Sequence, residues 1–138
     1  MDLSLIQIYQ ICLKVLRISD ETKSKLPLPI RWRLERNMDI LIPIAEQYEN
    51  IKTSIQNAYF GNDEKSIVTV NENGEKCRQI KEEYREEFDK KIEEFNQLGS
   101  ESYTLNIRKA DIGSFIDSLG DVDIPFEELD ALAFMDEG

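Results

Sequence analysis

Residues 30 to 59 carry an apolar pattern of the kind that a long helix presents along one side. From Leu34 to Tyr59 the pattern recurs in steps of four and three for about seven turns. Its members are Leu34, Met38, Leu41, Ala45, Tyr48, Lys52, Ile55 and Tyr59, widened by Ile44, Ile51 and Ala58. Pro29 suits a first turn because its ring fixes φ near the helical value, and Gly61 is typical of a helix end. We call this apolar row the seam, and we expect a helix here whose seam packs against another helix.

Two further long helices are expected, one before and one after this seam. The segment from Leu3 to Ile18 is apolar around almost its whole helical circumference, so it needs cover on several sides, from the rest of the chain or from a second copy. The segment from Glu75 to Leu98 has one apolar face, and glutamates alternate with lysines and arginines on its other faces. Residues 19 to 25 are polar and are predicted to form a loop.

The remaining segments predict a small amount of β structure and short helices. Residues 66 to 70 are β-branched, the turn sequence NENG follows, and residues 103 to 107 alternate as a strand that could pair with residues 67 to 70. Short helices are expected at residues 114 to 119 and 125 to 135. The predicted fold is mainly α with a minor two-stranded β element, a long-helix hairpin or bundle with short acidic C-terminal helices. The length of the chain, 138 residues, favours a single domain over residues 1–138.

Charge is distributed unevenly along the chain. The net charge is −11, yet residues 1 to 60 hold eight Lys or Arg and seven Asp or Glu, whereas residues 61 to 138 hold nine and twenty-one. Such an acidic chain is unsuited to direct nucleic-acid binding by phosphate neutralisation.

Polar residues interrupt the first apolar segment, and we therefore expect it to be neither a signal peptide nor a membrane span. Cys12 and Cys77 both lie in apolar helical patterns and are expected to be buried free thiols.

The sequence contains no histidine, which removes the commonest general base and most transition-metal sites. We therefore expect no enzymatic activity, no cofactor and no metal. An alternative is a divalent-cation site built from carboxylates, for which Asp117, Asp121 and Asp123 around Gly120 form the best cluster. The simpler interpretation is that these acids are solvated and favour the start of the helix that follows.

A ligand-binding site is predicted at the start of the long helix. Arginine offers a fork of donors, tryptophan a stacking surface, and a helix start directs backbone N–H groups outward, so an anion or nucleotide could bind there. The candidate residues are Arg31, Trp32, Arg33, Arg36 and Asn37. In the alternative interpretation, Trp32 anchors the core, the arginines pair with acids of the second half, and Asn37 makes a buried polar contact.

A partner-binding surface is predicted at the acidic C-terminal end. From Ala110 onward the chain has nine acids and no base, a composition suited to docking on a basic protein surface. The candidate residues are Asp117, Asp121, Asp123, Glu127, Glu128 and Asp130. The alternative is that the last helix simply packs its apolar side onto the core, through Phe126, Leu129, Leu132 and Phe134.

Four segments follow one another between Ile30 and Phe134: IRWRLERNMDIL, NENG, REEFDKKIEEF and IPFEELDAL. This order resembles a widespread group of small, mostly uncharacterised bacteriophage and prophage proteins. These have an Arg-Asn pair in a long helix, a Glu-rich helix with spaced phenylalanines, a short strand and an acidic Ile-Pro segment near the C-terminus. The resemblance implies a phage origin, and small phage proteins of this kind are either inhibitors that bind a host factor or parts of the virion and its assembly.

These observations predict a non-enzymatic, phage-encoded binding protein that occupies or sequesters a host factor. The partner would be a host-defence protein or a small anionic or nucleotide signal, met in the bacterial cytoplasm without contact with a membrane or nucleic acid. The alternative is a virion structural or assembly protein that works as a homo-oligomer through helices 3–18 and 30–59.

Overall fold

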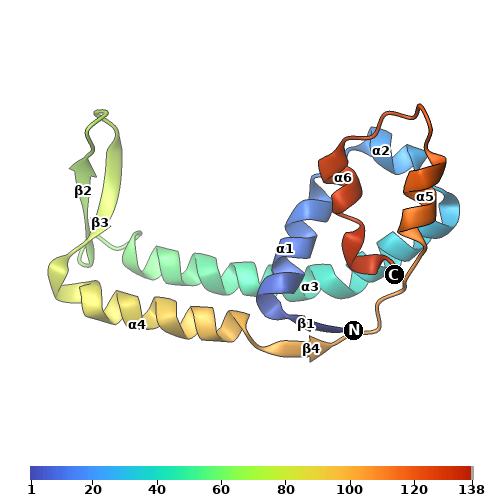
Figure 1. The fold of residues 1–138 in the computed structure, drawn as a ribbon. Helices are drawn as coiled ribbons and strands as arrows, with labels where there is room; N and C mark the ends of the chain where they lie inside the picture. The colour runs from blue at the N-terminus through green and yellow to red at the C-terminus, as the bar shows by residue number, and fades with distance from the viewer. Residues whose placement is uncertain (138) are drawn as a thin grey trace. The chain divides into compact units, whose positions relative to one another are not determined.

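A computed structural model describes residues 1–137 (Figure 1) and is mainly helical with two small antiparallel sheets. The prediction of a mainly α fold with a minor β element is thereby confirmed. In chain order the elements are β1 (Asp2–Ser4), α1 (Leu5–Leu16), α2 (Asp20–Lys25), α3 (Leu28–Tyr59), β2 (Ser66–Val70), β3 (Lys76–Ile80), α4 (Glu82–Gly99), β4 (Ser102–Thr104), α5 (Ile112–Ser118), α6 (Phe126–Asp130) and the 3-10 turn η1 (Ala133–Met135).

The chain divides into two compact units, and α3 belongs to both. Unit 1 consists of residues 1–46 and 102–138, and unit 2 consists of residues 47–101. The sequence prediction of a single domain over residues 1–138 stays a prediction, which a single cooperative unfolding transition would test.

Unit 1 contains the hydrophobic core. Figure 1 shows α1, α2, α5 and α6 gathered around the first half of α3. The predicted seam of α3 points inward here, since Leu41 is fully buried and Leu34 is 3% exposed. Helix α1 is fixed at its start by a capping box, in which Ser4 and Gln7 bond to each other's backbone N–H groups. The fully buried Leu132 and Met135 bring the C-terminal segment into the same core.

Asn37 connects α3 to a segment that has no regular structure of its own. Its side chain is fully buried, its Nδ2 donates to the carbonyl oxygen of Arg108 (2.9 Å), and its Oδ1 accepts from the Arg108 N–H (2.7 Å). Buried backbone groups need such partners because an unmade bond costs the full desolvation penalty. Ala110 in turn donates to Met135 (2.9 Å) and accepts from Glu137 (3.0 Å), so the C-terminus is attached to the segment that Asn37 holds.

Unit 2 consists of a helical hairpin and a β-hairpin. The end of α3 and helix α4 contact each other through aromatic rings: Tyr48 stacks on Phe95 at 4.6 Å, and Tyr59 meets the edge of Phe88 at 5.2 Å. Strands β2 and β3 pair antiparallel from Ser66 opposite Ile80 to Val70 opposite Lys76. Gly74 has a φ of 78° in the connecting turn, a conformation that glycine adopts without strain.

Several sequence predictions about local structure are wrong. Residues 19 to 25 are not a loop, because Ser19 caps the short helix α2. Residues 76 to 80 form strand β3 rather than the first turns of the third helix, which begins at Glu82. Residues 66 to 70 therefore pair with their neighbour in sequence, whereas β4 pairs with β1 at the N-terminus. The apolar spacing of residues 76 to 80 also fits a helix, so the sequence pattern alone did not distinguish this short strand from the start of the helix that follows.

The two cysteines differ from each other. Cys12 is 3% exposed, and burial raises the pKa of its thiol to about 11, which keeps it protonated. Cys77 is exposed on β3, so the prediction of a second buried thiol is wrong. In the part of the chain that the structure describes, no helix combines the length and the apolar character that a membrane crossing requires.

Replacing Asn37 by alanine is expected to destabilise the protein by about 2 kcal/mol, because both part-buried hydrogen bonds to the Arg108 backbone would be lost. Chemical denaturation followed by far-UV circular dichroism measures the change. Asn50→Ala is the matched control, since Asn50 lies exposed on the same helix and its loss should change stability by less than about 0.5 kcal/mol. Equal stability of the two variants would contradict the role assigned to Asn37.

Candidate functional site

The predicted ligand-binding residues are divided between the surface and the core. Arg31, Trp32 and Arg36 are exposed, Arg33 is half-buried, and Asn37 is fully buried. Asn37 therefore takes the buried polar role that the alternative interpretation assigned to it. Trp32 is 48% exposed and does not anchor the core. The first four residues remain candidates for direct contact with a ligand.

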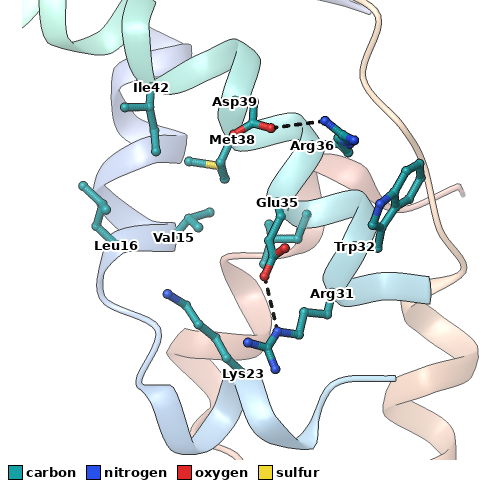
Figure 2. Close-up of a pocket in the computed structure, with 11 residues that line it drawn as sticks. Val15, Leu16, Lys23, Arg31, Trp32, Glu35, Arg36, Met38, Asp39 and Ile42 are labelled. Carbon is teal, nitrogen blue, oxygen red and sulfur yellow. Dashed lines mark hydrogen bonds and ion pairs between the residues drawn. The ribbon is translucent and has the colours of Figure 1, made fainter. Parts of the chain in front are cut away.

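An open groove of about 490 Å³ runs along α3 beside these residues (Figure 2). Figure 2 shows Val15 and Leu16 of α1 on the same side of the groove as Met38 and Ile42 of α3, with Lys23 of α2 directed toward it. The size lies within the range of small-molecule sites, which are apolar with a few placed polar groups. Its charged lining residues are Lys23, Arg31, Glu35, Arg36 and Asp39.

Trp32 is in contact with two guanidinium groups. The Arg36 guanidinium carbon lies 5.5 Å from the centre of the indole ring, and that of Arg108 lies 5.0 Å from it. Both distances are within the reach of a cation–π interaction, in which the negative face of the ring attracts the cation. The exposed ring thus has two positive charges within 5.5 Å of its centre, in a chain whose net charge is −11.

Arg108 is the residue of this cluster that sequence reasoning missed. It lies 76 positions after Trp32 in an irregular segment, and no motif around it suggested a site. Its place is set by Asn37, whose two hydrogen bonds hold the Arg108 backbone and so direct its side chain to the indole. Asn37 is therefore a positioning residue for the cluster.

The arginines of the groove are partly neutralised by acids on their own helix. Arg31 lies 3.3 Å from Glu35, and Arg36 lies 3.7 Å from Asp39. All four side chains are at least 45% exposed, and ion pairs between such groups contribute little because water screens them. An anionic ligand could displace these carboxylates at small cost. The alternative that the arginines pair with acids of the second half is not what these contacts show.

Two cations near the groove have no acidic partner within residues 1–137. Lys23 lines the groove, and Arg33 lies on the same helix, half-buried. With Lys23, Arg31 and Arg36 against Glu35 and Asp39, the groove lining carries three positive and two negative groups. The groove is therefore a positive site on a negative protein, which favours an anion there.

The predicted partner-binding acids fall into two groups. Glu128 and Asp130 bond within unit 1: Glu128 accepts from the Ser19 backbone N–H (2.6 Å) and the Thr22 hydroxyl (2.7 Å), and Asp130 pairs with Lys14 at 3.4 Å. The carboxylates of the others make no hydrogen bond or ion pair with the described part of the chain, residues 1–137, although the backbone carbonyl of Asp123 accepts from Lys25 Nζ (3.0 Å). These free acids are Asp117, Asp121, Asp123 and Glu127.

Within residues 1–137, no group of three Asp, Glu or Cys side chains converges as metal ligands would. The alternative that Asp117, Asp121 and Asp123 form a cation site is therefore without a geometric basis. These acids belong to solvated segments around the turn at Gly120, where φ is 56°.

Comparisons with protein-family models, with curated proteins and with solved structures found no match to this chain. Membership of the phage group therefore stays a prediction. What the protein binds has to be argued from the chemistry of its own groove and surfaces.

Glu128 makes stability depend on pH. The Thr22 hydroxyl and the Ser19 N–H hold the pKa of Glu128 below its ordinary value of 4.5, because they bond to the charged carboxylate. A lowered folded-state pKa means that the unfolded chain binds the proton first, so this stabilisation is complete above about pH 5 and is lost as the pH falls through the folded pKa. Glu128→Gln should lower the melting temperature at pH 7 and reduce its loss upon acidification.

The control for this prediction is Glu127→Gln, which removes one charge from the neighbouring position without removing a hydrogen bond. Thermal unfolding of both variants between pH 3 and 7 gives the comparison. Identical pH profiles of Glu128→Gln and the unmodified chain would contradict the capping role of Glu128.

Proposed function

We propose that this chain is a non-enzymatic binding protein of phage origin that sequesters a nucleotide-like signal of the bacterial host. The ligand has a planar ring and at least one phosphate. It lies along the groove of unit 1, with its charge at Arg36 and at Arg108, which approaches Trp32 from outside the groove lining. By occupying the signal, the protein would lower its free concentration in the host cytoplasm.

The observation that carries this proposal is the pair of guanidinium groups on one exposed indole. The Trp32 ring attracts both cations and so keeps both guanidinium groups beside it. Guanidinium groups bind phosphate with two parallel hydrogen bonds, which gives both strength and direction. The apolar side chains of the same groove include Leu16, which is 67% exposed, and a planar ring that covers such a surface is stabilised by the apolar area removed from water.

Binding rather than catalysis is proposed because of the groups that meet here. Guanidinium and ammonium groups keep their protons near neutral pH, and an indole is a donor only. Such groups hold and orient an anion, but they exchange no proton with it. The two carboxylates of the groove, Glu35 and Asp39, each lie beside an arginine of the same helix, so the site is suited to retaining a ligand unchanged.

Trp32 provides the test, because it is the only tryptophan of the chain and lies in the proposed site. Its fluorescence should change saturably when mononucleotides, dinucleotides or cyclic dinucleotides are added. Inorganic phosphate and an uncharged nucleoside should have weaker effects, since each offers only half of the ligand. A free tryptophan derivative measured in parallel corrects for absorption by the nucleotides.

Arg108→Ala should weaken nucleotide binding about tenfold, because it removes one of the two guanidinium groups. Lys109→Ala is the matched control, since it removes the same charge from the next, also exposed, residue and should leave affinity nearly unchanged. Calorimetry gives both values. If no nucleotide binds, or if the two variants lose affinity equally, the nucleotide site is refuted.

A second candidate function rests on the C-terminal acids. Phe126 is 77% exposed and Val122 is 47% exposed, and both lie among Asp121, Asp123 and Glu127. An exposed aromatic ring surrounded by unpaired charges is typical of a protein-binding surface. The partner in this case is a host protein with a basic, apolar surface that the phage protein would block.

The two candidate functions predict opposite effects of mutations. Retention of a host protein that survives Arg33→Ala with Arg36→Ala, but is lost when Asp121, Asp123 and Glu127 are changed to lysine, would support the acidic surface. The reverse pattern would exclude it. Native mass spectrometry of the protein taken from infected cells reports a retained nucleotide and a retained protein in the same measurement.

A further inference from the structure

We infer that the helical hairpin of unit 2 is a self-association surface, at which α3 and α4 pack against the same helices of a second copy of this chain. The surface lies in the other unit from the nucleotide groove. The inference is therefore independent of the proposed function.

Unit 2 has too little cover for its own apolar side chains. Among the hydrophobic residues between positions 47 and 101, those that are buried are Tyr48, Tyr59 and Ile80. The core cluster of the protein, by contrast, is made up entirely of residues from unit 1. A unit of this size with so small an interior needs a staple or a partner to be stable. The aromatic contacts between the two helices supply part of that stability and leave their flanks uncovered.

The uncovered flank is an apolar groove of about 610 Å³ between α3 and α4. Ile51 on α3 is 42% exposed, and Ile55 is half-buried beside it. On α4, Phe95 and Leu98 are half-buried along the same groove. Two antiparallel helices cannot enclose such a stripe, whereas two hairpins together form a four-helix bundle that does.

The balance of charges around the groove favours a second copy as the occupant. The groove is bordered by two cations and two anions, Lys65, Lys91, Glu87 and Glu94, in a chain whose net charge is −11. Two such chains repel each other, and they approach at least cost where each is locally neutral. The pairs Lys91–Glu94 (3.4 Å) and Lys65–Glu87 (3.7 Å) exist within one copy. A two-fold axis lets Lys91 exchange its partner for Glu94 of the second copy, so every charge stays paired.

Sedimentation equilibrium of the full chain over a wide range of concentrations tests the inference. The unmodified chain should form a reversible dimer. Ile51→Glu should raise the dimer dissociation constant about a hundredfold or more, because each dimer would bury two unpaired charges. Ile116→Glu is the matched control, since Ile116 is 41% exposed in unit 1 and its change should leave the dimer intact. A chain that is monomeric at every concentration, or one in which both variants behave alike, would overturn the proposal.

A charge exchange tests the proposed pairing itself. Lys91→Glu alone should weaken the dimer, and the double variant Lys91→Glu with Glu94→Lys should restore it, because the opposite charges then meet again across the axis. Circular dichroism and thermal unfolding at low concentration show whether the monomer is altered in any variant. If the double variant dimerises no better than Lys91→Glu, with its monomer folded, the pairing between copies is refuted.

Discussion

The side-chain amide of Asn37 supplies the two hydrogen bonds that a neighbouring strand would supply in a sheet. It does so from inside the helical seam, and it holds the backbone of Arg108, 71 positions further along. The C-terminal residues then bond to Ala110 in that segment. An irregular segment beside a core is costly unless its backbone groups are satisfied, and Asn37 satisfies them just before the segment whose Leu132 and Met135 enter the core.

The same contact connects the fold to the groove. Because Asn37 fixes the Arg108 backbone, the Arg108 side chain reaches the Trp32 ring that already faces Arg36. Glu128 of the C-terminal segment bonds to the start of α2, where it accepts from the Ser19 N–H and the Thr22 hydroxyl. Part of the acidic half of the sequence thus meets part of the basic half inside unit 1, and the groove keeps a positive surplus.

Unit 2 is stabilised by a different kind of contact. Ring stacking between α3 and α4, together with a short hairpin, replaces a hydrophobic core. Its glutamates and lysines are mostly exposed and pair along or between elements, as Glu86 does with Lys90. Such pairs stabilise the helix only slightly, but they leave the groove neutral. Unit 1 therefore contains the arginines around Trp32, whereas unit 2 presents an apolar groove between its helices.

Much of the helical structure could be read from the sequence because it depends on local spacing. The seam from Leu34 to Tyr59 is one face of a helix wherever that helix lies, and the turn at NENG follows from its residue types. The start of the Glu-rich helix was misjudged because five residues of strand β3 fit either period. Strand partners were misjudged because pairing depends on contacts remote in sequence.

The sequence by itself determined the long helix, the mainly α class, the acidic charge and the absence of histidine. Only the tertiary structure decided that Asn37 is buried, that Arg108 joins Trp32, and that Glu128 is a cap while Asp121 stays unpaired. The physical reason is the sequence separation between the interacting residues. Helix formation and net charge depend on neighbouring residues or on composition, whereas these contacts join residues 70 or more positions apart, which no local pattern encodes.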